Sequence, residues 1–324
     1  HLQFAHDQNE TLFLGRPNGS VFGWINTREF DQTGDSQRSQ GWCPTVVDTN
    51  GDGRITKPWN EPDPVRRTRF EEDTVASTYS FDPRLDTRVA VGAYGIIVNP
   101  VDGSVWGAQD SYPGKIIRLT LGHNPPESCI AEVFEVPSER WDVEATGEVG
   151  FMPRGIDVDR NGLIWTALSG TNHLASFDRS KCGPLSGSAA HEGRHCQEGW
   201  TLHPLPGPTF RGTDVRADYY YYNWVDQFNT LGLGENIPIA NGSSSDSLLA
   251  LMPDSKEWVV MRVPYPQGFH SRGLDGRIDD PNGGWKGRGL YATYGADAAW
   301  HVEGGPVEPG NLVKFQIRPH PLAN

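Results

Sequence analysis

The sequence lacks a long hydrophobic run and an excess of basic charge, and each absence excludes a class of partner. Its 324 residues carry 28 Lys and Arg against 41 Asp and Glu, which gives a formal net charge of −13. A chain this acidic does not offer the basic face that nucleic acids or an anionic membrane surface require. No apolar stretch approaches the roughly 18 residues that span a bilayer. The sequence therefore predicts neither a nucleic-acid partner nor a membrane span.

Short catalytic signatures are also missing. The sequence contains no G-x-S-x-G elbow, no P-loop, no dinucleotide fingerprint leading into a helix and no haem attachment motif. The string HEGRH (191–195) matches the HExxH pattern of zinc peptidases, which functions only on a helix. Gly193 lies within it and Cys196 follows at once, so we expect a histidine-rich loop instead.

Methionine is scarce, with 3 residues, whereas 38 Gly and 25 Pro are present and aromatics make up 10% of the chain. This composition favours many tight turns and β-strands over long helices. All-β barrels and propellers of such length often form one domain, so we expect residues 1–324 to be a single domain. The chain opens at HLQFAHDQNE without a secretory leader, which we interpret as a processed start or the loss of an N-terminal segment.

The 4 cysteines show no metal-site or haem spacing. Cys182 and Cys196 bracket a polar, glycine-rich loop that a disulfide would staple, and Cys43 and Cys129 could form a second bridge. An even cysteine count of this kind favours an exported protein, secreted or periplasmic. Four free buried thiols are the alternative.

One strand–turn–strand pattern recurs along the chain. GIIVNPVDGSVWGAQ (95–109) and GIDVDRNGLIWTALSG (155–170) match almost position for position. Asp102-Gly103 and Asn161-Gly162 are typical of two-residue hairpin turns. Looser copies begin at Ala5 and Ser271, and a weaker one at Tyr222.

Short segments between these units complete a four-stranded repeat. CPTVVDT, AEVFEVP, WTLHPLP and WVVMRVP each fit an outer strand. Four strands repeated every 45–60 residues or so predict an all-β fold, a β-propeller of four-stranded blades. Five blades are legible, and we expect six or seven in the complete ring. A β-sandwich or a right-handed β-helix is the alternative.

The stretch MPRGIDVDRNGLIWTALSGTNHLASFD (152–178) resembles the blade motif of the virginiamycin B lyase-like (streptogramin lyase) propellers. That motif reads Pro-His-Gly-Ile, four residues, Asp-Gly, a strand with Trp, and a later Asn and Asp. The matching residues are Pro153, Gly155, Ile156, Asn161, Gly162, Ile164, Trp165, Asn172 and Asp178. NHL-type and gluconolactonase-like propellers share much of this motif, so the resemblance implies the fold more than the chemistry.

The resemblance also implies metal-assisted β-elimination by His and Glu beside a divalent cation at the axis. Where the family has His after Pro, this chain has Arg154. We expect catalytic candidates to face the mouth of the axial channel, namely His6, Arg154, His270, Arg272, His301 and Glu303. In the string HVE, His301 and Glu303 lie on one face of a strand and could share a cation, or they are surface loop residues.

Arg154 and Arg272 occupy equivalent repeat positions and together predict a site for a carboxylate or phosphate. Alternatively, Asp157 and Asp275, three residues later in each repeat, neutralise them as structural ion pairs. The candidate ligand-binding residues are Asp7, Tyr94, Trp224 and Asp226. The aromatic group formed by Tyr219–Tyr222, Trp224 and Phe228 is either a stacking platform for sugars or aromatic ligands, or packing between blades.

DTNGDGRIT (48–56) reproduces the start of an EF-hand-type calcium loop. Its expected ligands are Asp48, Asn50, Asp52 and the carbonyl of Arg54. Trp59 stands where the loop normally has a bidentate Glu, and the prolines that follow exclude a helix. We therefore predict a structural, loop-only calcium site, against the alternative of a plain turn.

Two functional hypotheses follow. The first is a non-catalytic exported propeller that binds a small molecule or carbohydrate, or serves as a subunit of a larger extracytoplasmic assembly. The second is a metal-assisted lyase or hydrolase with its site at the axial channel mouth. Replacement of the family's His by Arg154 favours the first.

Overall fold

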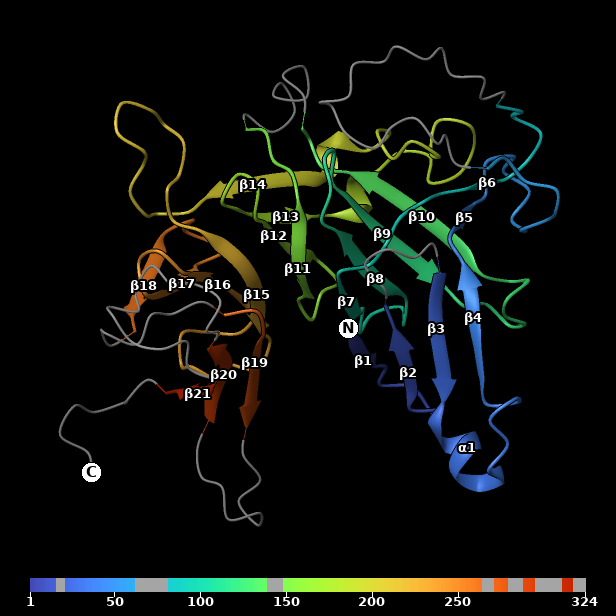
Figure 1. Ribbon diagram of the computed structural model, residues 1–324, viewed down its shortest axis with the longest axis horizontal. Coiled ribbons are helices and arrows are strands. Elements are labelled where there is room, and N and C mark those ends of the chain that lie inside the picture. Colours follow the sequence, from blue (N-terminus) through green and yellow to red (C-terminus); the bar gives the residue numbers. More distant parts are fainter. Residues whose placement is uncertain are drawn as a thin grey trace.

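Five sheets lie around a common axis in the computed structural model of the protein (Figure 1). The structure describes residues 1–15, 21–61, 81–138, 148–263, 271–278, 288–294 and 311–316. Within these ranges, no helix is long and apolar enough to cross a membrane. The predicted β-propeller is confirmed, and the β-sandwich and β-helix alternatives are excluded.

Each blade is an antiparallel meander of strands that runs outward from the axis. Blade 1 contains β1 (Leu2–Phe4), β2 (Thr11–Leu14), β3 (Val21–Asn26) and β4 (Gln40–Pro44). Blade 2 contains β7 (Gly95–Val98), β8 (Val105–Gln109), β9 (Lys115–Thr120) and β10 (Ile130–Glu135). Blade 3 contains β11 (Pro153–Val158), β12 (Ile164–Leu168), β13 (His173–Phe177) and β14 (Trp200–Pro204).

Blade 4 contains β15 (Tyr220–Asp226), β16 (Ile237–Gly242), β17 (Ser247–Leu251) and β18 (Trp258–Arg262). In the described residues, blade 5 contains β19 (Leu274–Ile278), β20 (Arg288–Tyr294) and β21 (Asn311–Phe315). The five legible repeats thus correspond to the five sheets. The larger blade number of the complete ring stays a prediction, as does the single domain.

Helices are few and short. Helix α1 (Thr27–Thr33) connects β3 to β4 and begins after Asn26, whose side chain accepts from the Glu29 amide. Two 3₁₀ turns, η2 (Arg179–Lys181) and η3 (Gln197–Gly199), lie between β13 and β14. HEGRH lies in turns and bends between η2 and η3, so the expected histidine-rich loop is confirmed.

The repeated turns are longer than the predicted two-residue hairpins. The Asn99 amide donates to the Ser104 carbonyl at 2.8 Å, and the Asp159 amide to the Leu163 carbonyl at 3.0 Å. A two-residue type I′ turn needs positive φ at both central positions. Among the described residues of these turns, only Gly103 (φ 69°) and Gly162 (φ 90°) have it, so each glycine closes a three- or four-residue loop.

The repeated tryptophans fill the space between neighbouring blades. Trp106 of β8 and Trp165 of β12 are both almost completely buried. Trp106 packs against Phe134 of its own blade and Phe177 of blade 3, with ring centroids 5.9 and 6.1 Å apart. Burying a large aromatic side chain contributes about 2–3 kcal/mol, so these two tryptophans stabilise the contacts between blades.

Matching β-bulges open the innermost strands of blades 3 and 4. The β11–β12 register shifts between Pro153 and Ile156, and the β15–β16 register between Tyr220 and Asn223. At the bulges β11 and β15 pack closely, as shown by the 2.8 Å that would separate a Cβ on Gly155 from the Tyr222 Cα. Bulges re-aim side chains, and these two leave Arg154 and Tyr221 outside the ladder.

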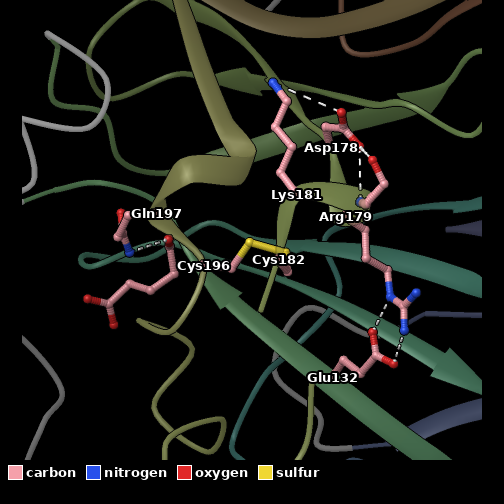
Figure 2. The surroundings of a disulfide bond; sticks show 9 residues. Glu132, Asp178, Arg179, Lys181, Cys182, Cys196 and Gln197 are labelled. Carbon is pink, nitrogen blue, oxygen red and sulfur yellow. Dashed lines mark hydrogen bonds and ion pairs between the residues drawn. A yellow bond between two sulfur atoms is a disulfide. The ribbon is translucent and has the colours of Figure 1, made fainter. Parts of the chain in front are cut away.

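Both predicted disulfides are formed, and the alternative of four free thiols is wrong. Cys43–Cys129 joins the end of β4 in blade 1 to the residue before β10 in blade 2. Cys182–Cys196 closes the loop between η2 and η3 (Figure 2). Two disulfides indicate an oxidising, extracytoplasmic environment.

The outer edge of blade 2 is covered by other segments. β5 (Val46–Val47) runs parallel to β10, and β6 (Thr87–Arg88) pairs with β5. The 182–196 loop of blade 3 lies against β10, where the Glu135 amide donates to the Gly193 carbonyl at 2.8 Å. Arg194 donates to the Glu135 carboxylate at 2.8 Å. These contacts pair strand edges that would otherwise be open.

Candidate functional site

Four side chains from four blades meet at one end of the innermost strands. Tyr94 precedes β7, Arg154 and Tyr221 occupy the bulges of β11 and β15, and Arg272 precedes Gly273 and β19. We call these four residues the axial cluster. Three of them, Tyr94, Arg154 and Arg272, are the ones that repeat equivalence predicted.

The two arginines of the axial cluster share one aromatic ring. The Arg154 Cζ atom lies 4.6 Å from the Tyr221 ring centroid, and the Arg272 Cζ atom lies 5.6 Å from it. Arg154 also lies 5.7 Å from the Tyr94 ring centroid. The hydroxyls of Tyr94 and Tyr221 are hydrogen-bonded to each other. Stacking on an aromatic face orients a guanidinium and leaves its in-plane N–H groups for a ligand.

Arg154 is a largely buried cation with unused hydrogen-bonding capacity. Its side chain is 18% exposed, and its Nε has no hydrogen-bond partner among the described residues. The nearest carboxylate, that of Asp110, is 3.9 Å from its Nη2, beyond hydrogen-bond distance. A buried donor without an acceptor is costly, so this site favours an added anion.

Tyr94 of the axial cluster and its neighbour Tyr222 remain protonated at neutral pH. Burial, followed by the hydrogen bond with Tyr221, raises the pKa of Tyr94 above its ordinary value. Burial likewise raises the pKa of the neighbouring Tyr222. These phenols therefore stay protonated and add no negative charge beside the arginines.

Repeat matching missed Tyr221 and the N-terminal residue. The His1 ring is stacked on Tyr222 at 5.9 Å between centroids and lies 5.3 Å from Tyr94. Aligning YYNWVD (221–226) with RGIDVD (154–159) places Tyr221 opposite Arg154. The shared Val-Asp ending was the available signal, but the run of four tyrosines obscured it.

His6 and Asp7 do not reach the axial cluster, so the position assigned to His6 is wrong. Leu2, the first residue of β1, pairs with the last residue of β2, just as Gly95, the first residue of β7, pairs near the end of β8. β1 therefore begins at the same end as β7, which is the end of the axial cluster. His6 follows β1 and is exposed in the loop at its opposite end. Asp7 shapes this loop by accepting from the Thr11 amide and hydroxyl at 2.9 and 2.7 Å.

Trp224 and Asp226 lie within the protein interior, where their contacts serve packing and loop structure. This supports the packing alternative for this part of the aromatic group. Trp224 packs between blades 4 and 5, where a Cβ on Gly276 would lie 1.8 Å from its ring. Asp226 is fully buried and accepts from the amides of Thr230 and Leu231 at 2.6 and 2.8 Å. Phe228 is 55% exposed and lies beneath Arg160 rather than at the axis.

Asp157 does not neutralise Arg154 as the ion-pair alternative expected. Its carboxylate accepts from the amides of Val158 and Val225 at 2.8 and 2.6 Å, which joins β11 to β15. Burial, with a smaller contribution from Asp275, raises the pKa of Asp157 to about 7. The carboxylate that does pair with Arg154 is that of Asp110, at 3.9 Å.

Three predicted site residues, His270, His301 and Glu303, lie outside the described residues. Within the described ranges, no group of three His, Cys, Asp or Glu side chains is already gathered as a metal site. The divalent cation at the axis stays a prediction.

The Asp48 loop has the hydrogen bonding of a calcium-type loop. The Asp48 carboxylate accepts from the amides of Gly51, Asp52 and Gly53 at 2.8, 3.1 and 2.9 Å. Asn50 accepts from the Asp52 amide at 2.9 Å, and Asp52 from the Arg54 amide at 2.9 Å. The side-chain oxygens at positions 1, 3 and 5 are thus held by the backbone of the loop.

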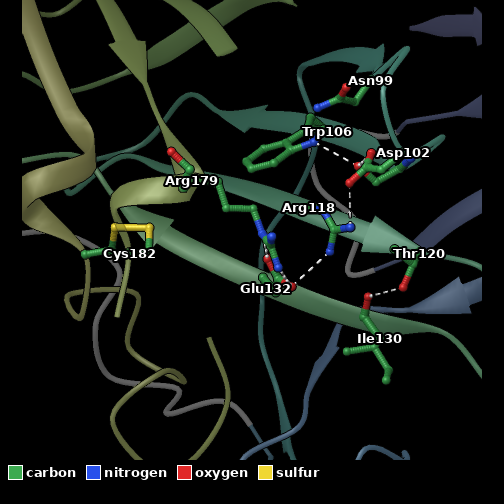
Figure 3. Close-up of polar contacts among 12 residues, drawn as sticks. Asn99, Asp102, Trp106, Arg118, Thr120, Ile130, Glu132, Arg179 and Cys182 are labelled. Carbon is green, nitrogen blue, oxygen red and sulfur yellow. Dashed lines mark hydrogen bonds and ion pairs between the residues drawn. A yellow bond between two sulfur atoms is a disulfide. The ribbon is translucent and has the colours of Figure 1, made fainter. Parts of the chain in front are cut away.

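Away from the axis, a buried charge network joins blades 2 and 3. Glu132 of β10 accepts from Arg118 at 2.9 Å and from Arg179 at 2.6 and 2.7 Å (Figure 3). Arg118 also donates to Asp102 in the turn before β8 at 2.7 Å. Every charge in this network is paired, which identifies it as a structural feature.

No known family model matches the chain, and no curated protein matches its sequence. Solved structures match it in fold. Virginiamycin B lyase from Staphylococcus aureus superposes with a TM-score of 0.47 and 11% identity, over 99% of this chain and 70% of the lyase. A streptogramin B lyase gives 0.41 and 10%, over 98% and 83%. A protein of unknown function from Bacteroides caccae gives 0.40 and 12%, over 94% and 89%. Similarity at such identities concerns the fold alone.

Proposed function

We propose that this chain is a secreted or periplasmic ligand-binding propeller. Its axial cluster would hold a small molecule that carries a carboxylate or phosphate beside an aromatic or sugar ring. The observation that carries the proposal is Arg154, a largely buried guanidinium that stacks on Tyr221 while its Nε lacks an acceptor among the described residues.

The charge of the axial cluster suits an anion. Arg154 of blade 3 and Arg272 of blade 5 both lie over the Tyr221 ring, in a chain of net charge −13. Guanidinium groups match carboxylates and phosphates with paired N–H donors, and such charge-assisted bonds are about twice as strong as neutral ones. Tyr94 and Tyr221 would add hydroxyl groups and ring faces for the rest of the ligand.

The same groups favour binding over chemistry. An arginine stays protonated in proteins and moves no proton, and the raised pKa of Tyr94 keeps its phenol neutral. The described cluster thus provides orientation and charge neutralisation, as a binding module does. A propeller of this kind, alone or as a subunit of a larger extracytoplasmic assembly, would present its ligand or bind its partner from this end.

Calorimetric titration with phenyl phosphate and benzoate tests the proposal, with benzyl alcohol as the uncharged comparison. Arg154→Ala is expected to weaken phenyl phosphate binding at least tenfold. Arg160→Ala is the matched control, because Arg160 also lies over an aromatic ring, Phe228, at 5.3 Å but is exposed and paired with Glu235.

Equal affinities for Arg154→Ala and the unsubstituted protein would exclude the axial cluster as the anion site. The lyase or hydrolase hypothesis predicts a different result. Turnover of an ester or lactone that a chelator abolishes in the Asp52→Asn variant as well as in the unsubstituted protein would indicate a metal outside the Asp48 loop and replace the binding hypothesis.

A further inference from the structure

The loop formed by residues 48–54 lies beside a fully buried carboxyl group from a distant part of the sequence. Asp86, which precedes β6, has no exposed surface, and its Oδ1 has no hydrogen-bond partner among the described residues. Its Oδ2 accepts from the Thr56 amide at 2.9 Å, two residues beyond Arg54. The Asp86 carboxyl is thereby held beside the end of this loop. Asp48, Asp52 and Asp86 are not yet gathered as a metal site, so an ion would have to draw them together.

We propose that Asp86 provides the distal carboxylate of a Ca²⁺ site whose other ligands are Asp48, Asn50, Asp52 and the carbonyl of Arg54. In an EF-hand-type loop, that carboxylate comes from a Glu at position 12. Trp59 occupies the position here. Asp86 supplies the missing charge from 38 positions beyond Asp48 in the chain, which local sequence spacing does not reveal.

The Asp86 Oδ1, which has no hydrogen-bond partner among the described residues, is the observation that distinguishes an ion site from a plain turn. The hydrogen bonds within the loop explain its shape equally well with or without an ion. A buried carboxylate oxygen without a donor is costly, and a cation relieves that cost. The carboxylates of Asp48 and Asp52 lie near enough to Asp86 to repel it, so a positive charge among the three would be stabilising.

The ligand chemistry selects calcium. Three carboxylates, one amide oxygen and one carbonyl make five oxygen ligands, and water would complete the six to eight that Ca²⁺ takes. Mg²⁺ demands a tighter octahedron and keeps several waters. No sulfur or imidazole lies among the proposed ligands, so zinc is not favoured.

The ion would also fasten the outer edge of blade 2. Asp48 directly follows β5 and Asp86 directly precedes β6, and these two strands pair with each other beside β10. The Asp48 carbonyl accepts from the Gly187 amide of the disulfide loop at 2.9 Å. Bound Ca²⁺ would therefore stabilise contacts between blades 1, 2 and 3.

The experiment uses the full chain after removal of divalent ions by chelation. Calorimetric titration measures the affinity for Ca²⁺, and Tb³⁺ luminescence excited through Trp59 reports binding at this loop. Tm measured with and without about 1 mM Ca²⁺ reports the stabilisation that linkage requires. We expect Ca²⁺ to raise Tm and Mg²⁺ at the same concentration to raise it much less. Asp86→Asn should weaken Ca²⁺ binding at least tenfold.

Two further variants make the outcome decisive. Asp52→Asn changes an exposed side chain, so the variant should fold. It should also weaken Ca²⁺ binding at least tenfold. Asp82→Asn is the control, because Asp82 pairs with Arg84 at 2.6 Å rather than facing the loop, and it should bind Ca²⁺ normally. Absence of Ca²⁺ binding by the unsubstituted chain, or unchanged affinity in a folded Asp86→Asn protein, would overturn the proposal.

Discussion

Arg179 of blade 3 donates two hydrogen bonds to the single carboxylate of Glu132 in blade 2, at 2.6 and 2.7 Å. Arg118 donates to the same carboxylate from within blade 2. One carboxylate thus binds two guanidinium groups where two blades meet, and its removal would leave both without their shared partner.

Glu132→Gln is expected to lower the free energy of unfolding by about 2–4 kcal/mol, since breaking a buried pair leaves an uncompensated charge. Urea unfolding measures the loss. Glu10→Gln is the control, because its pair with Arg28 is more than half exposed on both sides and should contribute under about 1 kcal/mol. Equal losses in the two variants would contradict the structural role of Glu132.

Replacing both Cys182 and Cys196 by Ser is expected to destabilise the protein by about 3 kcal/mol, the usual contribution of a disulfide that closes a loop of about 15 residues. The longer 43–129 loop should contribute about 4–5 kcal/mol by the same chain-entropy argument. Urea unfolding of the two double variants compares them. A larger loss for the 182–196 pair would mean that its contacts with β10 outweigh loop entropy.

Asp157 should make stability depend on pH. Burial raises its folded-state pKa to about 7, above the unfolded value of about 3.9. Its contribution to stability is therefore fully present below about pH 4 and is lost as pH rises through 7.

The stability difference between the unsubstituted protein and Asp157→Asn should accordingly shrink between pH 4.5 and 7.5, by about 2–4 kcal/mol. Asn has one acceptor oxygen where Asp157 uses two, so the variant should have the lower free energy of unfolding at acid pH. Urea unfolding across this range checks the prediction, and parallel stability curves would contradict it.

Gly155→Ala should be poorly tolerated. The new Cβ would lie 2.8 Å from the Tyr222 Cα and 2.9 Å from the Asn223 amide nitrogen, both backbone atoms that cannot rotate away. Overpacking of this kind costs about 1–3 kcal/mol. Gly183→Ala is the control, because no atom lies within 4 Å of its new Cβ. Thermal unfolding of the two variants should show a clear loss of Tm only for Gly155→Ala.

The sequence predicted the propeller because each blade repeats the same physical requirements. Trp106 and Trp165 mark the space between blades, and Gly103 and Gly162 mark turns that need positive φ. The same regularity led to three of the four residues in the axial cluster. The loop that Cys182 and Cys196 bracket indicated one disulfide, and Cys43–Cys129 was the possible second pair that remained.

Other features depend on contacts that spacing does not encode. The register of β1 decides which end of the strand carries His6, and only pairing with β2 reveals it. The bulge in β15 moves Tyr221 into position without any local sequence break. Asp86 reaches the Asp48 loop because β5 and β6 pair across 39 intervening positions, from Val47 to Thr87 (roughly the length of one blade).

The paired bulges of β11 and β15 have an evolutionary consequence. Arg154 and Tyr221 lie outside the ladder, so exchanging either side chain would not shift the register of its strand. Duplicated blades of this kind offer a lineage several independently mutable positions around one axis. Selection could thus change what the protein recognises one blade at a time, with the scaffold held constant.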